Sequence, residues 1–140
     1  MATKSVGATT AMAFALECMR RGALVSEAFG DNAPYDFIVD VQGVLHRVQV
    51  KGSSCNKNGT FQANTQRRTL VPKPEGRGFV CKAAAYKKGQ IDFIAAEFFG
   101  HWCIWGQPHL LPATIGFNPL KATVGKKWAQ GHEAWHLLGF

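Results

Sequence analysis

The sequence predicts an α/β fold in a single domain, with a mixed β-sheet at its centre. Apolar residues recur at helical spacing near the start of the chain. Several short apolar runs of strand length follow, and a tight turn joins two of them. The chain has 140 residues, of which 46% are hydrophobic and 18% charged. This length and composition suit one hydrophobic core and exclude a disordered chain.

The first predicted element is a helix over residues 8–21. Its predicted core face consists of Met12, Ala15, Leu16 and Met19. These residues recur at the spacing of one helical face, so we expect that face to pack against the sheet. Gly22 follows as a C-cap because glycine readily adopts the left-handed conformation that ends many helices.

Strands are predicted next. Residues 23–26 form a short strand, and a turn-rich loop, FGDNAP, follows. The runs FIVDV and LHRVQV then have the length and composition of strands. Gln42-Gly43 lies between them and favours a tight hairpin.

Residues 52–78 are polar, basic and rich in Gly, Asn and Pro, which predicts a long loop or mobile arm. Within it, Phe61 and Gln62 pair briefly as a strand. FVCKAAAY is a strand or the start of a helix, and IDFIAAEF and HWCIW are two strands separated by Gly100. After Pro112 the pattern weakens to one helix-like turn that Gly131 breaks.

The chain carries a formal charge of +7, from 16 Lys and Arg against 9 acidic residues. Most of the excess follows residue 46. Such a surplus favours a polyanionic partner, nucleic acid before membrane. The alternative is ordinary charge that keeps the protein in solution.

Targeting and redox signals point to a reducing compartment. The four cysteines form no C-x-x-C pair, and we expect them to be free thiols. No run approaches the ~20 apolar residues of a membrane span. Glu17 and the Arg20-Arg21 pair interrupt the apolar AMAFAL too early for a secretory signal. We therefore expect the cytoplasm of a bacterium, an archaeon or a phage-infected cell.

Polar side chains are predicted to gather at one end of the hairpin. Side chains alternate between the faces of a strand, so Gln49 and Lys51 share one face with Arg47, while Val48 and Val50 face the core. Asp36 begins the partner strand. Because the pair is antiparallel, Asp36 lies near the same end of the sheet as Lys51.

This combination suits metal-assisted hydrolysis of a phosphodiester. The Asp36 carboxylate, the Gln49 amide oxygen and the Val50 carbonyl are hard oxygen ligands of the kind that Mg²⁺ accepts. The Lys51 ammonium beside them would stabilise charge on a phosphate or help to deprotonate water. The competing interpretation is the solvated face of an amphipathic strand.

The runs Y-D-F-I-V-D and R-V-Q-V-K resemble the PD-(D/E)xK nuclease superfamily, in the variant where glutamine replaces the middle acid. This variant is similar to group I intron-associated endonucleases and to small archaeal and phage Holliday junction resolvases. The resemblance covers residues 7 to about 96. It implies a restriction-endonuclease-like mixed β-sheet flanked by helices, Mg²⁺ with Mn²⁺ able to substitute, and a homodimer or homotetramer. It makes Asp36, Gln49 and Lys51 the catalytic residues and Asp36, Gln49 and Val50 the metal ligands.

One position departs from the pattern. Junction resolvases of this type carry a metal-binding Glu on the first helix, and the matching position here is Ala11. Glu17, the nearest carboxylate, falls almost opposite the predicted core face and is a poor substitute. Either the site works without a helix carboxylate, or a natural or introduced change has weakened this chain. We expect Ala11→Glu to raise metal-dependent cleavage.

Further residues are predicted to contact DNA. The candidates are Arg47, Ser53, Lys57, Arg67, Arg68 and Lys73. Arg67 and Arg68 are the best candidates for phosphate contacts, which position DNA without reading its sequence. Ser53 is equally well explained as a loop residue. Asp40 is expected to cap the hairpin turn.

GHEAWH also matches the helical zinc motif H-E-x-x-H. His132 and His136 would then share a helix face, with Glu133 as general base and a third ligand from His101 or His109. The context favours a different interpretation, in which Trp135 and Leu137 pack the C-terminal segment.

Taken together, these features predict a metal-dependent DNA endonuclease. The resemblance favours a Holliday junction resolvase that acts in DNA recombination and cuts four-way junctions as a symmetric dimer. A homing or restriction-type endonuclease on duplex DNA is the second choice, with base readout in residues 52–78. A DNA-binding protein whose site has decayed is the third, because of Ala11 and Gln49.

Overall fold

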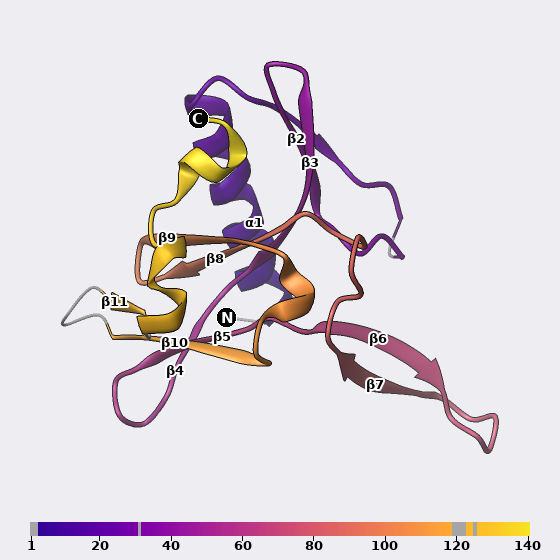
Figure 1. Cartoon of the computed structure of the whole chain (residues 1–140). Coiled ribbons are helices and arrows are strands. Elements are labelled where there is room, and N and C mark those ends of the chain that lie inside the picture. Colours follow the sequence, from indigo (N-terminus) through magenta and orange to yellow (C-terminus); the bar gives the residue numbers. More distant parts are fainter. Residues whose placement is uncertain (1–2, 31, 119–122, 125) are drawn as a thin grey trace.

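We analysed a computed structural model that describes residues 3–30, 32–118, 123–124 and 126–140 (Figure 1). The described part of the chain contains a single α-helix, α1 (Thr3–Arg20), together with β-strands and short 3-10 helices. None of its helices has the length and apolarity required to span a bilayer. The predicted α/β class with a mixed sheet is confirmed, although α1 is the one α-helix of the described residues that flanks the sheet.

The central sheet has five strands in the order β1-β2-β3-β8-β9. Its strands are β1 (Leu24–Glu27), β2 (Phe37–Val41), β3 (Val44–Lys51), β8 (Phe93–Phe98) and β9 (His101–Gly106). The pair β3–β8 is parallel and the other pairs are antiparallel, so the sheet is mixed. All five strands coincide with runs predicted from the sequence.

Two smaller sheets complete the fold. The four-stranded sheet has the order β11-β10-β5-β4, and a separate hairpin pairs β6 with β7. Their strands are β4 (Ser54–Cys55), β5 (Phe61–Asn64), β6 (Arg67–Pro72), β7 (Phe79–Ala84), β10 (Thr114–Asn118) and β11 (Thr123–Val124). The β6–β7 hairpin projects from the body of the molecule (Figure 1).

The prediction of a long loop over residues 52–78 is therefore wrong. This range contains β4, β5 and β6, and β7 follows it. Exposed side chains dominate the β6–β7 hairpin, so no alternation of apolar and polar residues marked it. The brief strand expected at Phe61 and Gln62 is confirmed as part of β5, and residues 79–84 of the ambiguous run 79–86 form a strand.

Helix α1 ends as predicted at Gly22, which has a φ of 93°. The Gly22 amide donates to the Met19 carbonyl and the Ala23 amide to the Cys18 carbonyl at 3.0 Å each. These two bonds form a Schellman motif, which satisfies carbonyls that the last turn would leave unpaired.

The predicted core face of α1 is wrong except at Ala15, which is half-buried and packs against the core. Phe14 and Cys18 are fully buried, with Thr10 on the same side, whereas Met12 is 72% exposed. Leu16 and Met19 are also exposed. The Phe14 ring packs against the rings of two tryptophans, Trp102 and Trp135, at centroid distances of 5.5 and 5.9 Å.

The β2–β3 hairpin forms as predicted. Its turn residues Gln42 and Gly43 have φ values of 53° and 87°. Positive φ at both central positions is the geometry that matches the twist of paired strands. The Gly43 amide donates to Asp40 Oδ1 at 2.8 Å, which confirms Asp40 as the residue that caps the turn.

Two cores lie on opposite faces of the central sheet. The first joins α1 and the C-terminal segment to the sheet and includes Phe14, Val48, Val50 and Trp135. The second lies between the central and the four-stranded sheets, and it includes Ala96, Phe98 and Phe117. Strand β3 sends Val48 and Val50 into the first core, so Gln49 and Lys51 face the other side.

The C-terminal segment consists of two 3-10 helices, η2 (Lys126–Gly131) and η3 (Trp135–Leu138); η1 (Pro108–Leu110) precedes β10. No Cβ fits at Gly131, because it would lie 2.2 Å from Trp105 Nε1. Trp135 is buried as expected and belongs to one hydrophobic cluster with Leu138, whereas Leu137 is exposed. The H-E-x-x-H segment is thus not one helix, and its helical zinc pair is wrong.

Candidate active site

Asp36 is fixed at the start of β2 by both its backbone and its side chain. Its amide donates to the Val48 carbonyl at 3.0 Å. Its Oδ2 accepts a hydrogen bond from the Val50 amide at 2.9 Å. The Asp36 carboxylate is therefore tied through Oδ2 to the end of β3. Among the described residues, none donates a hydrogen bond to Oδ1.

Gln49 and Lys51 follow on β3 at alternate positions. This strand is central in the sheet, because β2 pairs with its first part and the parallel β8 pairs with residues 48–51. A central strand holds side-chain positions more firmly than an edge strand does. Gln49 donates a hydrogen bond from Nε2 to the Val50 carbonyl at 3.3 Å, so its amide oxygen remains available.

The Lys51 ammonium lies in a half-buried environment. Nζ donates to the Gln66 carbonyl at 2.7 Å and lies 5.6 Å from the centroid of the Tyr86 ring. Burial lowers the pKa of Lys51 to about 8; Asp36 opposes this shift and the nearby Arg68 guanidinium adds to it. Lys51 is therefore a cation held at a desolvation cost.

Burial is also the main cause of the pKa shifts of Asp36 and Tyr86. It raises the pKa of Asp36, against the opposing effects of the Val50 hydrogen bond and Lys51, while Glu27 raises it further. It raises the pKa of Tyr86 to about 12, and the Asp36 charge adds to that rise. A cation that binds beside a buried carboxylate stabilises the charged form, which burial disfavours.

One cavity of about 610 Å³ brings these groups together. It is lined by Asn32, Ala33, Pro34, Asp36, Gln49, Lys51, Arg67, Arg68, Thr69, Leu70 and Tyr86. The cavity lies between the end of β3 and the β6–β7 hairpin, which supplies its basic wall. Tyr86 was not predicted as a site residue, because its position in the run FVCKAAAY gave no indication that it would reach β3.

Four predicted DNA contacts do not line this cavity: Arg47, Ser53, Lys57 and Lys73. The guanidinium of Arg47 forms an ion pair with Asp92. Its Nη2 lies 3.0 Å from Asp92 Oδ1, and its Nε and backbone amide both donate to Asp92 Oδ2. The Asp92 pKa is lowered chiefly by this side-chain hydrogen bond. The side chain of Arg47 thus joins β3 to the segment before β8.

Ala11 is half-buried on α1 and packs against the first core, and it is not a lining residue. The helix nevertheless passes the end of β3. A Cβ at Gly52, one residue after Lys51, would lie 3.6 Å from Thr10 Oγ1. Ala11 therefore follows Thr10, a residue that approaches the end of β3 next to Lys51.

The donor set fits a hard divalent cation. Asp36 offers one carboxylate, Gln49 an amide oxygen and Val50 a carbonyl, which are ligand types that Mg²⁺ accepts while it keeps several waters. Asp36 is the only carboxylate among the cavity-lining residues that the structure describes. A site with so little negative charge would hold one ion weakly.

A mixed sheet that presents a carboxylate, an amide and a lysine to one basic cavity is consistent with a nuclease-type fold. Comparisons with known proteins agree. A profile of the PD-(D/E)XK endonuclease family matches residues 1–102. The chain belongs to the PD-(D/E)XK endonuclease family, and this confirms the resemblance drawn from its sequence.

Among solved structures, the chain is similar to that of a bacterial homing endonuclease, I-Ssp6803I. The two are 25% identical and superpose with a TM-score of 0.79, over 99% of this chain and 93% of the other. A search of curated proteins found no match. The likeness extends beyond residue 102, so the four-stranded sheet and the C-terminal segment belong to the shared fold.

Proposed function

We propose that this protein is a divalent-metal-dependent endonuclease that cuts duplex DNA at a particular sequence. The observation that carries the proposal is the shared cavity of Asp36, Gln49 and Lys51 beside the β6–β7 hairpin. The similarity to a homing endonuclease supports a duplex substrate. The branched substrate implied by the sequence resemblance becomes the second candidate.

Asp36, Gln49 and the Val50 carbonyl would hold one Mg²⁺ or Mn²⁺. When bound, such an ion polarises a phosphoryl oxygen and lowers the pKa of a bound water. Asp36 orients the ligand set, because its second oxygen is tied to the Val50 amide. Lys51 donates to the scissile phosphate once its bond to the Gln66 carbonyl opens, and it neutralises charge that develops there.

The β6–β7 hairpin supplies the DNA-binding surface. Two antiparallel strands form a ribbon of the width that the major groove admits. The exposed side chains of this ribbon include Arg68, Lys73, Arg77 and Lys82. Arginine and lysine at the groove edge contact phosphates, while neighbouring side chains such as Thr69 can read base edges.

A homodimer would present two such sites to the two strands of a duplex. The exposed apolar residues Met12, Leu16 and Met19 form one face of α1. An apolar helical face is typical of a contact between protein surfaces, and a two-fold axis would pair it with its own copy. We propose this face as the dimer contact, with a tetramer requiring a further surface.

The proposal is tested with a library of duplex DNA and with a four-way junction and its matched linear duplex. Each is incubated with the protein in Mg²⁺, Mn²⁺ or EDTA, and both binding and products are scored. We expect metal-dependent cleavage of a subset of duplex sequences. Cleavage of the junction alone would select the resolvase candidate. Binding without products in any metal would select a DNA-binding protein whose site has decayed.

A further inference from the structure

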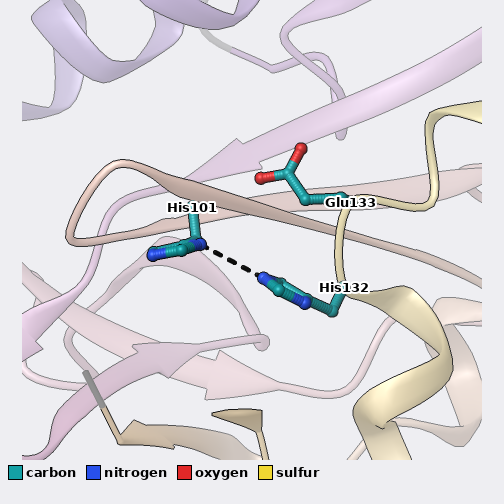
Figure 2. Close-up of side chains that lie close together, drawn as sticks. All are labelled: His101, His132 and Glu133. Atoms are coloured by element: carbon teal, nitrogen blue, oxygen red, sulfur yellow. Dashed lines mark hydrogen bonds between the residues drawn. The ribbon is translucent and has the colours of Figure 1, made fainter. Parts of the chain in front are cut away.

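A cluster of metal-ligating side chains lies outside the cavity described above (Figure 2). His101 begins β9, while His132 and Glu133 lie between η2 and η3. One ligand atom from each lies within 4.8 Å of the other two. His132 Nε2 and His101 Nδ1 are 3.2 Å apart and share a hydrogen bond. The cluster thus joins the edge strand of the central sheet to the C-terminal segment.

The spacing of the two imidazoles already suits one metal ion. Zinc binds histidine nitrogen at about 2.0–2.1 Å, and tetrahedral geometry places two such nitrogens about 3.4 Å apart. The observed 3.2 Å lies close to that separation. One Glu133 oxygen lies within 4.8 Å of both nitrogens, so a movement of the imidazole rings by at most about 1.4 Å would complete three ligands.

The Glu133 carboxylate is held in place by other groups. Oε1 accepts a hydrogen bond from the Trp102 amide at 2.9 Å, and Oε2 accepts one from Trp135 Nε1 at 2.8 Å. Donors of this kind orient metal-ligating carboxylates and leave each oxygen a lone pair for the ion. Glu133 also has a φ of 50°, a left-handed conformation that is strained for a non-glycine residue.

The surroundings of the two histidines are partly apolar. The His101 ring lies 5.2 Å from the Phe117 ring and the His132 ring 6.1 Å from it, and both histidines are half-buried. An apolar shell of this kind limits the access of water to a bound ion. Phe117 belongs to β10, so the cluster meets three parts of the fold.

From these observations we infer that His101, His132 and Glu133 form a second metal site, which takes a borderline transition-metal ion such as Zn²⁺. The site goes beyond the proposed nuclease function. Two imidazoles and one carboxylate match Zn²⁺ better than Mg²⁺, which prefers an all-oxygen set. The ion would clamp the C-terminal segment to β9. His136, the other histidine of the H-E-x-x-H segment, is exposed on η3 and has no part in it.

The test measures Zn²⁺ binding to the full-length chain carrying Asp36→Asn, so that the nuclease cavity does not contribute and no cleavage is required. The failure of this inference and that of the proposed function are therefore distinguishable. Equilibrium dialysis with Zn²⁺ alone gives the stoichiometry. We expect one ion per chain, lost on adding His101→Gln or His132→Gln and kept on adding His136→Gln as the matched control.

Thermal unfolding provides the second measurement. Saturating Zn²⁺ should raise the Tm of the Asp36→Asn protein by roughly 5 °C. It should not raise the Tm of the His101→Gln or His132→Gln forms. The Tm of each form in EDTA shows whether it is folded before metal is added. Glu133→Gln, which retains an acceptor oxygen, covers the case in which a histidine variant fails to fold, and it should weaken Zn²⁺ binding at least tenfold.

No bound Zn²⁺ in the Asp36→Asn protein would overturn the inference. So would an unchanged stoichiometry in a folded His132→Gln form, or equal loss in the His136→Gln control. Visible absorption of bound Co²⁺ that depends on His101 and His132 would support the imidazole ligation directly.

Discussion

Lys51 combines a buried position with a charge, and this combination has a measurable consequence for stability. In the unfolded chain its pKa has the ordinary value of 10.5, whereas burial lowers it to about 8 in the folded protein. Between these values the unfolded chain binds more protons than the folded one. Stability should therefore rise with pH across this interval, because folding no longer has to desolvate an ammonium group.

We predict that this rise depends on Lys51. The unfolding free energy of the Lys51→Met variant, relative to wild type, should fall by up to about 3 kcal/mol between pH 8 and 10.5. Urea unfolding across this pH range measures the difference. Lys88→Met, at an exposed lysine, is the matched control and should show no such trend. A flat difference for Lys51→Met would show that the amine is not desolvated.

Ala11→Glu should raise the single-turnover cleavage rate in Mg²⁺ by about tenfold, since an added carboxylate would strengthen a site that has only Asp36. Position 11 adjoins Thr10, which approaches the end of β3. Ala13→Glu introduces the same side chain at an exposed position of the same helix and should leave the rate unchanged. Equal rates for both variants and wild type would contradict a role for position 11.

The juxtaposition of Asp36, Gln49 and Lys51 could be predicted from sequence because it needs only strand alternation and one antiparallel turn. The partners of these residues could not. Gln66, whose carbonyl accepts a hydrogen bond from Lys51, lies 15 positions from it in the sequence. Asp92, which pairs with Arg47, lies 45 positions from that arginine. Contacts at such separations depend on how the strands associate, which no local pattern records.

At the scale of elements, we propose that the β6–β7 hairpin binds DNA, while Asp36, Gln49 and Lys51 carry out the chemistry. Arg68 lines the cavity and its charge lowers the Lys51 pKa, so it lies near the catalytic groups, and its side chain is exposed. Neither core includes a residue of β6 or β7. Changes to its exposed side chains should therefore affect DNA affinity more than folding.

We predict that Arg68→Ala weakens DNA binding several-fold and uniformly across sequences. Loss of one phosphate contact should reduce the slope of log affinity against log salt by about 1. Fluorescence anisotropy at several salt concentrations, in EDTA to prevent cleavage, measures both quantities. The control Arg20→Ala removes an exposed arginine at the end of α1. An unchanged slope for Arg68→Ala would place the DNA elsewhere.

Helix α1 illustrates why an element can be predicted while its orientation cannot. Its C-terminal end and its glycine cap follow from local sequence, but it begins at Thr3, five residues before the predicted start at residue 8. The stripe of Met12, Leu16 and Met19 is the most apolar face, yet the helix buries Phe14 and Cys18 instead. Packing around the rings of Trp102 and Trp135 decides the orientation, and both tryptophans lie far from α1 in sequence.

At the scale of the whole molecule, the exposed apolar stripe of Met12, Leu16 and Met19 predicts that two copies of the chain form a dimer. Leu16→Glu should convert a dimer into a monomer at micromolar concentration, because a charge would enter an apolar contact. Light scattering coupled to size exclusion gives the mass of each species. Leu110→Glu changes another exposed leucine, on η1, and should leave the dimer intact. A wild-type monomer at all concentrations would contradict the proposed contact.

The arrangement of the central sheet could be predicted in outline because its strands are apolar and separated by clear turns. The second sheet could not. Its strands are short and come from two segments, residues 54–64 and 114–124, that are far apart in the sequence. The pattern of one segment therefore does not predict that it pairs with the other. This sheet closes the second core beneath the face that carries Lys51.

The central claim is that Asp36 and Lys51 carry out the chemistry in one cavity while the hairpin holds DNA. The most direct measurement compares single-turnover cleavage and DNA affinity for wild type, Asp36→Asn and Lys51→Ala, on a duplex that the wild type cuts in Mg²⁺. We predict that each variant loses at least a thousandfold in rate and binds DNA within about threefold of wild type. Wild-type cleavage by either variant would contradict the account.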